Sequence, residues 1–228
     1  MEGLLVTRDV WKVYNQGKPN ETVALAGVSL RIKKGDFVAI MGPSGSGKTT
    51  LLDIVGCLLK PSSGKVFVDG IDIGKIRDNE IAKIRGEKIG FIFQQYNLIS
   101  SITALENVEI PMRIMGMGKN QSRKRAEELL GIMGLEKRIS HKPPQLSGGE
   151  QQRVAISRAL ANEPKIILGD EVTGNLDSKN GKKILGLLKR LNREKKYTIL
   201  LVTHDQRVSR YAERIIRLKD GKIAGAAS

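Results

Sequence analysis

Eight consecutive residues, Gly42-Pro-Ser-Gly-Ser-Gly-Lys48-Thr49, match the pattern G-x-x-x-x-G-K-[ST] of a phosphate-binding loop. Glycines let the backbone curl so that successive N–H groups point inward, and the helix that follows adds the positive end of its dipole. Lys48 would reach the β- and γ-phosphates, and the Thr49 hydroxyl would be a ligand of Mg²⁺. An apolar run over residues 37–41 precedes the loop and a helical pattern over 49–59 follows it, which a simple glycine-rich turn would not require. The sequence therefore predicts a nucleotide site formed by Gly42, Pro43, Ser44, Gly45, Ser46, Gly47, Lys48, Thr49 and Thr50.

Two carboxylates follow a second apolar run. Residues 166–169 (Ile-Ile-Leu-Gly) lead directly into Asp170 and Glu171, where a buried strand would end. We expect Asp170 to support the metal ion, through a water molecule, and Glu171 to polarise an attacking water as a general base. The alternative is that the pair merely ends a strand and begins a loop, and the pair alone does not decide between the two.

The segment Leu146-Ser-Gly-Gly-Glu150 has the composition of a second phosphate-binding site. Two glycines at the start of a predicted helix expose free N–H groups, and Ser147 can accept or donate a hydrogen bond there. Because one nucleotide rarely needs two such sites from one chain, we expect Ser147, Gly148, Gly149 and Glu150 to bind the nucleotide of a second copy. The Ser-x-x-Glu spacing also fits an ordinary helix N-cap, and both interpretations can hold.

The elements that would position these groups alternate along the chain. Apolar patterns predict strands over 23–32, 37–41, 65–68, 89–93, 166–170, 198–203 and 214–218. Helical patterns cover 49–59, 122–133, 147–160, 178–193 and 206–212, with a further capped start at Thr103 and a kink expected at Pro111. Strands that alternate with helices indicate a mainly parallel sheet covered on both faces, into which the helical stretch of about 98–160 is inserted. We expect a single domain, in which 1–97 and 161–228 form the ATP-binding core.

Composition restricts the class of protein. The 228 residues suffice for one domain with a substantial core, and the single cysteine, Cys57, fits a reducing compartment. Apolar runs are too short for a membrane-spanning helix, and Glu2 and Asp9 near the beginning do not suggest a secretory signal, so we expect a cytoplasmic location. A formal net charge of +15 favours anionic partners, namely nucleotide, nucleic acid or an anionic membrane surface.

These motifs together resemble the ATPase subunits of ABC transporters, and the resemblance extends over essentially the whole chain. It implies the fold of a P-loop ATPase of the ABC type, with a mainly parallel α/β core, an N-terminal antiparallel β region and an inserted helical subdomain. It also implies the cofactors ATP and Mg²⁺, an ATP-dependent homodimer, and a separate integral membrane permease as partner. On this basis no specific nucleic acid is expected as a partner, and the chain would lie on the inner face of the cell membrane.

The resemblance further implies roles for individual residues. Tyr14 resembles the aromatic residue that stacks on adenine. Gln94 resembles the glutamine that senses the γ-phosphate, contacts Mg²⁺ and faces the permease, so the implied metal set is Thr49, Gln94 and Asp170. His204 resembles the histidine that contacts the γ-phosphate, which makes Glu171, His204 and Gln94 the implied catalytic set. The loop that crosses between the two subunits is implied at Asn175, Leu176 and Asp177.

Within this family the chain is most similar to the lipoprotein-release, macrolide-export and cell-division type. The segments that carry this similarity are 56–64, 93–98, 103–108 and 146–164. Glu150 stands where Gln is commoner in the family, which adds a negative charge near phosphate. Val172 stands where the family usually has Pro, which leaves the backbone beside Glu171 freer.

Three other classes of protein fit these residues less well. A soluble ABC ATPase that acts on nucleic acid or ribosomes suits the net charge, but the stretch from Lys48 to Ser147 is too short for a long coiled coil, and the chain holds a single set of motifs. A P-loop GTPase or small-molecule kinase leaves residues 146–150 unexplained, and the sequence has no Asn-Lys-x-Asp motif. A binding module without activity would not require the full set of carboxylate, glutamine and histidine.

Overall fold

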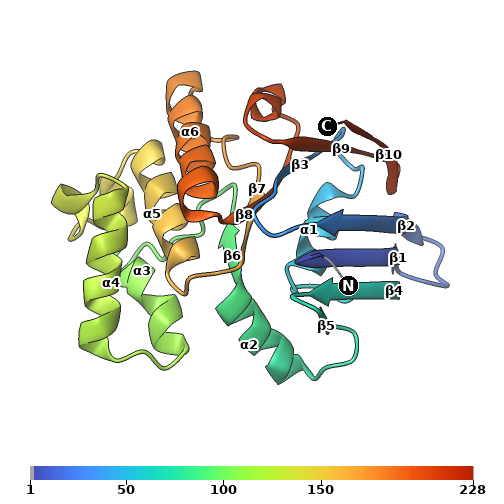
Figure 1. Cartoon of the computed structure of the whole chain (residues 1–228), viewed down its shortest axis with the longest axis horizontal. Coiled ribbons are helices and arrows are strands. Elements are labelled where there is room, and N and C mark those ends of the chain that lie inside the picture. Colours follow the sequence, from blue (N-terminus) through green and yellow to red (C-terminus); the bar gives the residue numbers. More distant parts are fainter. Residues whose placement is uncertain (1–2, 228) are drawn as a thin grey trace.

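The computed structural model describes residues 3–227 and contains two sheets with helices around them (Figure 1). The larger sheet has six strands in the order β10-β9-β3-β8-β7-β6. Its central strands run parallel, and β10 pairs antiparallel with β9 at the edge. Their bounds are β3 Phe37–Met41, β6 Ile89–Ile92, β7 Ile166–Asp170, β8 Thr198–Thr203, β9 Arg214–Lys219 and β10 Lys222–Ala227. Every residue of β8 is buried, as the continuous apolar run predicts for a strand covered on both faces.

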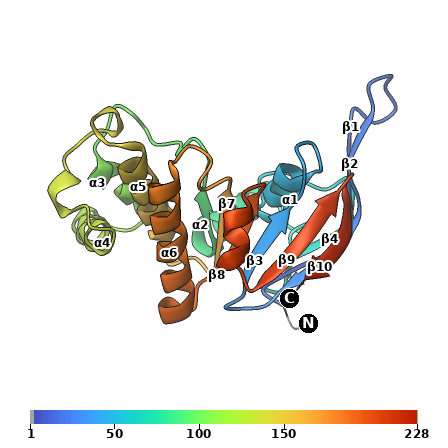
Figure 2. The same cartoon turned by 90° about the horizontal axis from the view of Figure 1, so that it is seen from above.

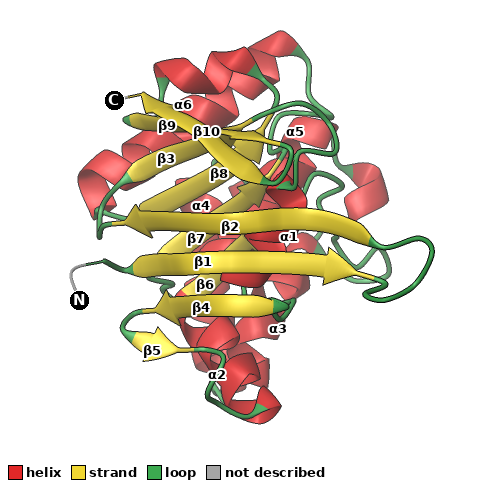
Figure 3. Cartoon of the chain, turned by 90° about the vertical axis from the view of Figure 1, so that its right-hand side faces the viewer, coloured by secondary structure: helices red, strands yellow, loops and turns green. Residues whose placement is uncertain are grey.

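The smaller sheet is antiparallel and has the order β2-β1-β4-β5 (Figure 3). Leu5 pairs with Ile32 on one side and with Val68 on the other, which fixes the register of the three long strands. The bounds are β1 Leu5–Tyr14, β2 Thr22–Ile32, β4 Ser63–Val68 and β5 Ile71–Asp72. Helix α1 (Lys48–Val55) shares one apolar core with this sheet and with β3, β7 and β8. The helix that follows the phosphate-binding loop is therefore fixed by both sheets.

Four of the other helices form a second core. They are α3 Ala104–Ile114, α4 Lys119–Ile132, α5 Gly148–Leu160 and α6 Ser178–Lys195, with short 3₁₀ turns η1 Glu136–Arg138, η2 Pro143–Gln145 and η3 Gln206–Arg210. Figure 2 shows α3, α4 and α5 together on the side of the molecule away from the antiparallel sheet. Their apolar faces pack on one another and, with α6, on the large sheet. Pro111 lies inside α3, and the helix continues past it to Ile114.

The predicted fold class is confirmed, and besides the 3₁₀ turns η1 and η2, four helices or strands were not predicted. These are β1, the two-residue strand β5, helix α2 (Asp78–Lys88) and β10. Helix α2 lacks a clear apolar stripe, because only Ile81 and Ile84 of its residues are buried. The register of β1 against β2 is irregular at three places, which interrupts the simple alternation expected of a strand.

Helix α1 is shorter than its apolar pattern suggests. It ends at Val55, and the next residue is Gly56, where an added side chain would lie 2.1 Å from the ring of Phe91. Cys57 then adopts a left-handed conformation with φ of 60°, and the backbone N–H of Leu58 donates to the carbonyl of Asp53. This closes the helix in the manner of a Schellman motif, with cysteine at the position that glycine usually occupies.

Candidate functional site

The phosphate-binding loop joins β3 to α1 and has the open backbone that its glycines predict. Gly45 and Gly47 have φ of 77° and 96°, and a side chain on Gly47 would lie 2.4 Å from the carbonyl oxygen of Ala24. Helix α1 begins at Lys48 with no side-chain cap and no acidic residue in its first turn. Its first N–H groups are therefore available to an anion, which the helix dipole also favours.

Lys48 is anchored by the loop that it serves. Its Nζ donates to the carbonyl oxygens of Gly42 and Pro43, at 2.9 and 2.7 Å, and the residue is 9% exposed. An ammonium group has three donors, so one remains for a phosphate. The Ser46 hydroxyl, in the same loop, is buried and has no hydrogen-bond partner among residues 3–227, which adds a second unused polar group.

A pocket of about 720 Å³ lies over this loop and collects most of the predicted site. Its lining combines the loop with the ends of β6, β7 and β8: Ser44, Gly45, Gly47, Lys48, Thr49, Thr50, Gln94, Asp170, Glu171 and His204. Sequence reasoning missed the wall formed by Thr22, Val23 and Ala24 at the start of β2. Val23 is 48% exposed, and no local pattern in the sequence marks these three residues as part of a pocket.

Asp170 lies among negative charges. Burial raises its pKa, and the neighbouring carboxylates of Glu171 and Asp53 raise it further, while Lys48 and the Thr49 hydroxyl lower it. Carboxylate and hydroxyl oxygens around one pocket are ligands that suit Mg²⁺, which usually takes few protein groups and completes its shell with water and phosphate oxygens. The accumulated negative charge fits a divalent cation at this place.

Substitution of Asp170 by Asn is expected to stabilise the protein in the absence of nucleotide. A raised carboxyl pKa means that the folded state binds the proton more tightly than the unfolded state does. The contribution of Asp170 to the free energy of unfolding is therefore greatest at low pH and is lost as the pH rises through the folded pKa. Asn removes this loss, and we expect the Tm at neutral pH to rise by a few degrees, while Mg²⁺ should no longer add to the stabilisation by ATP. Thermal melts with and without Mg²⁺ test this. Asp78→Asn, on an exposed side chain, is the control and should leave both quantities unchanged.

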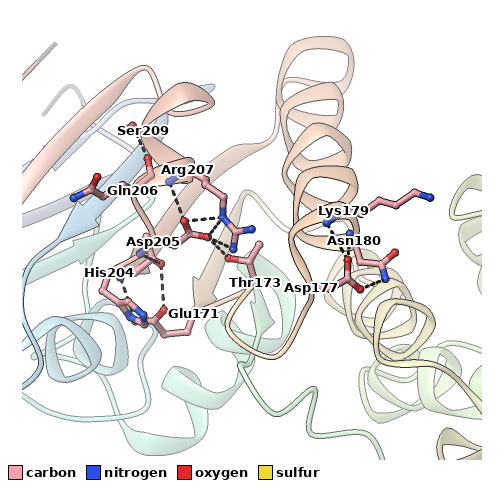
Figure 4. A network of polar contacts seen from close by, with 11 residues as sticks. Glu171, Thr173, Asp177, Lys179, Asn180, His204, Asp205, Gln206, Arg207 and Ser209 are labelled. Atoms are coloured by element: carbon pink, nitrogen blue, oxygen red, sulfur yellow. Dashed lines mark hydrogen bonds and ion pairs between the residues drawn. The ribbon is translucent and has the colours of Figure 1, made fainter.

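Glu171 and His204 meet at the ends of β7 and β8 (Figure 4). The Nδ1 atom of His204 lies 2.7 Å from Oε1 of Glu171, and the Thr203 hydroxyl donates to Oε2 at 3.2 Å. An ionised carboxylate only accepts, so Nδ1 carries the proton and Nε2 is directed elsewhere. The Glu171 side chain is 14% exposed and that of His204 is 73% exposed. The mostly buried carboxylate of Glu171 is thus hydrogen-bonded to the exposed imidazole of His204, which can contact a ligand.

The backbone at Glu171 is unusual, with φ of 45°. The N–H of Glu171 donates to the carbonyl of Val202, and its own carbonyl accepts from Gly174, which closes a tight turn. Val172 is buried, and its Cγ1 would lie 2.5 Å from a side chain added at Gly169. The turn is therefore fixed by packing of Val172 over Gly169, although it lacks proline.

The loop after this turn is tied to its neighbours by polar contacts. Thr173 donates to Asp205 at 2.9 Å, and Arg207 also donates to Asp205 (Figure 4). Burial raises the pKa of Asp205, but the hydrogen bonds from Arg207 and Thr173 outweigh burial and the net pKa is lowered. Asp177 caps α6 by accepting from the backbone N–H groups of residues 179 and 180.

The Ser147 segment does not line the pocket over Lys48. Ser147 is the N-cap residue of α5, and its side chain accepts from the N–H of Glu150. The carboxylate of Glu150 accepts in return from the N–H and hydroxyl of Ser147, each at 2.8 Å. The predicted capping box is present, and Ser147 itself is exposed at the start of the helix.

Helix α5 connects this exposed segment with the rest of the site. In its middle, Gln152 donates to the carbonyl of Val172 at 3.0 Å. Near its end, the Arg158 guanidinium donates to the carbonyls of Tyr96 and Asn97, which follow Gln94. Asn175, in the loop after Glu171, donates to the carbonyl of Gln94 at 2.8 Å and so connects these two loops. The turn at Glu171, the loop after Gln94 and helix α5 are thus directly connected.

Tyr14 lies apart from the pocket lining, which also does not include Gly42, Pro43 and Ser46 of the loop itself. It is at the end of β1, is 38% exposed, and has the ammonium group of Lys12 over its ring at 5.2 Å. An exposed ring at a strand end offers a flat face for stacking, but its role with adenine stays a prediction.

A phosphate-binding loop between β3 and α1, with polar residues at the ends of adjacent parallel strands, defines a P-loop nucleoside triphosphatase. The model of one family, described as ABC transporter, matches residues 25–174. The chain belongs to the ABC transporter family. No helix among residues 3–227 combines the length and apolar character needed to span a bilayer.

Three relatives narrow this assignment. An uncharacterised ABC transporter ATP-binding protein of Methanocaldococcus jannaschii, MJ0796, is 54% identical, over 96% of this chain and 95% of its own. The lipoprotein-releasing system ATP-binding protein LolD 1 of Rhodopseudomonas palustris is 46% identical over 99% and 100%. The macrolide export ATP-binding/permease protein MacB of Vibrio parahaemolyticus is 48% identical, over 96% of this chain but only 33% of its own length. The chain is an ATP-binding subunit of an ABC transporter, of the same type as LolD and the ATP-binding part of MacB.

Solved structures agree with the fold. A dimeric structure of a post-hydrolysis state of MJ0796, bound to ADP and Pi, superimposes with a TM-score of 0.90 at 52% identity, over 98% of each chain. A second dimeric structure of the same cassette gives the same TM-score at 53% identity. The chain is therefore an ABC ATPase, which confirms the predicted enzyme class, and nothing in these comparisons favours an ATPase that acts on nucleic acid.

Proposed function

We propose that the chain acts as an ATP-driven homodimer on the cytoplasmic face of a membrane, where it moves a separate permease. The observation that carries this proposal is the separation of two phosphate-binding segments. One chain places Lys48, Glu171 and His204 around one pocket, while the segment 146–150, in which Ser147 is exposed, lies outside the lining of that pocket. A second copy could supply that segment, which is consistent with the two dimeric structures of MJ0796.

The proposed reaction uses groups of this chain at defined places. Lys48 and the N–H groups of the loop bind the β- and γ-phosphates, and the partner's Ser147 segment binds the γ-phosphate from the other side. Glu171 accepts a proton from the attacking water, while His204 holds that carboxylate through Nδ1 and contacts the γ-phosphate. Thr49, Asp170 and Gln94 would hold Mg²⁺, which would neutralise charge on the phosphates when bound. Tyr14 would stack on adenine.

The arrangement also suggests how hydrolysis reaches the permease. ATP binding closes the dimer, and loss of the γ-phosphate removes the bridge between the copies and opens it. Gln94 lies in the pocket, and the loop that follows it contacts α5, so the surface near Gln94 is where the permease would bind. We further propose that about 98–160 act as a helical subdomain on a core of 1–97 and 161–228. Residues 175–177 would cross between the copies, and no specific nucleic acid is required.

Dimer formation tests this proposal. In a Glu171→Gln background, which blocks hydrolysis, sedimentation should show a dimer with ATP and a monomer without it. Adding Ser147→Arg should abolish the dimer, because a long side chain fills the phosphate position, while ATP affinity of the monomer by calorimetry stays unchanged. Ser63→Arg, exposed on β4, is the matched control and should dimerise normally. A hydrolysis-blocked protein that stays monomeric with ATP would refute the proposal.

A further inference from the structure

Arg138 reaches the Ser147 segment through Glu150. The two oxygens of the Glu150 carboxylate have different partners: Oε2 accepts from Ser147, and Oε1 accepts from Nε of Arg138 at 3.0 Å. The Glu150 side chain is 19% exposed and that of Arg138 is 46% exposed. Glu150 therefore lies between a cation and the serine that is proposed to bind phosphate.

The backbone that carries Arg138 is fixed. The carbonyls of Ile139 and His141 accept from Leu105 and Ala104, the first N–H groups of helix α3, at 3.0 and 2.8 Å. Leu135, just before the turn η1, is buried in the core. These contacts satisfy N–H groups that a helix start would otherwise leave without partners, so the turn cannot shift without cost.

His141 constrains the guanidinium from its other side. Nη1 of Arg138 lies 3.3 Å from Nε2 of His141, and because a guanidinium has no acceptor, Nε2 must accept. The histidine proton is then on Nδ1, which is buried and has no hydrogen-bond partner in the structure. Arg138 is thus held between a carboxylate and an imidazole rather than extended into solvent.

The Glu150 carboxylate places a negative charge beside Ser147, and Arg138 can neutralise this charge. The hydrogen bonds from Ser147 come first among the causes that lower the pKa of Glu150 to about 2, and Arg138 contributes as well. Glu150 is therefore fully ionised at neutral pH. A carboxylate within one turn of Ser147 repels a γ-phosphate, and among the described residues Arg138 is the cation that lies within ion-pair distance of it.

We propose that Arg138 is a positioning residue of the second phosphate site, because it cancels the charge of Glu150 and leaves Ser147 and the N–H groups of α5 able to bind the terminal phosphate of a nucleotide on a second copy. This inference rests on the proposed dimer. In the absence of Arg138, the carboxylate would oppose closure at both sites of the dimer.

The test measures the dimer dissociation constant with ATP in the Glu171→Gln background. Arg138→Gln should weaken the dimer by roughly fivefold per site, and so by about 25-fold for two sites, as expected for loss of a partly exposed ion pair. Adding Glu150→Gln should restore most of the affinity, since a neutral amide needs no compensation. Lys137→Gln, an exposed neighbour in the same turn, changes the net charge equally and should leave the dimer unchanged.

The outcomes separate the two proposals. If the Glu171→Gln parent does not dimerise with ATP, the proposed function itself is wrong. If the parent dimerises but Arg138→Gln has no effect, or if Arg138→Gln/Glu150→Gln is as weak as Arg138→Gln alone, the role of Arg138 is refuted. Thermal melts check the fold, because a merely structural role would lower Tm and would not be rescued by Glu150→Gln.

Discussion

Substitution of Glu171 by Gln is expected to lower the ATP turnover rate by roughly 10² to 10⁴-fold, the range that a positioned general base contributes. The amide fits the same space and can keep a contact to His204 or Thr203, but it cannot accept a proton from water. ATP affinity should stay within about threefold of the parent, since Glu171 does not bind the phosphates directly in the proposed mechanism. Steady-state phosphate release and equilibrium nucleotide binding measure the two quantities.

The control for this substitution is Glu213→Gln. Glu213 is also a carboxylate with a cationic partner, Lys189, at 2.9 Å, but it lies outside the pocket lining. The Glu213→Gln variant should hydrolyse ATP at the parent rate. Normal turnover by Glu171→Gln would show that another group activates the water.

Substitution of Lys48 by Ala is expected to weaken ATP binding by about 100-fold, which corresponds to about 2.7 kcal/mol, within the range for hydrogen bonds to charged groups. Two of its three donors hold the carbonyls of Gly42 and Pro43, so the change also releases the loop from its present shape. Calorimetric titration with ATP measures the affinity directly.

Lys60→Ala is the matched control, because Lys60 is exposed and pairs with Asp78 on the surface. It should bind ATP like the parent and should melt at a similar temperature. If Lys48→Ala kept the parent affinity, the nucleotide would not be bound where the loop places it.

Local sequence patterns were sufficient for the phosphate-binding loop and for the strands that end beside Glu171 and His204. Glycine spacing, the apolar run before Asp170 and the capping box at Ser147 each depend on neighbours in sequence, and the structure places them as expected. The elements that escaped prediction depend on distant contacts. Helix α1 ends where Phe91 approaches Gly56, and helix α2 has a single pair of buried isoleucines to mark it.

The residues of the nucleotide pocket also divide into those that local sequence marks and those that only distant contacts bring together. Thr22, Val23 and Ala24 enter the pocket only because the antiparallel sheet folds over the phosphate-binding loop, which no local pattern encodes. Arg138 lies twelve positions before Glu150, so its ion pair depends on the turn that brings η1 beside α5. The sequence could predict residues that carry chemistry by type, and it could not predict residues that act through their position in the fold.

In the proposed dimer, helix α5 would provide a basis for cooperativity. Its 13 residues extend about 20 Å at the usual rise per residue. Ser147 lies at one end, Gln152 holds the turn of Glu171 in the middle, and Arg158 holds the loop after Gln94 at the other end. A nucleotide bound by one copy would contact the start of helix α5 in the other copy. Because this helix is continuous, the contact would influence the groups that surround the other copy's own nucleotide. Occupancy of the two sites should then rise together, with a Hill coefficient above one.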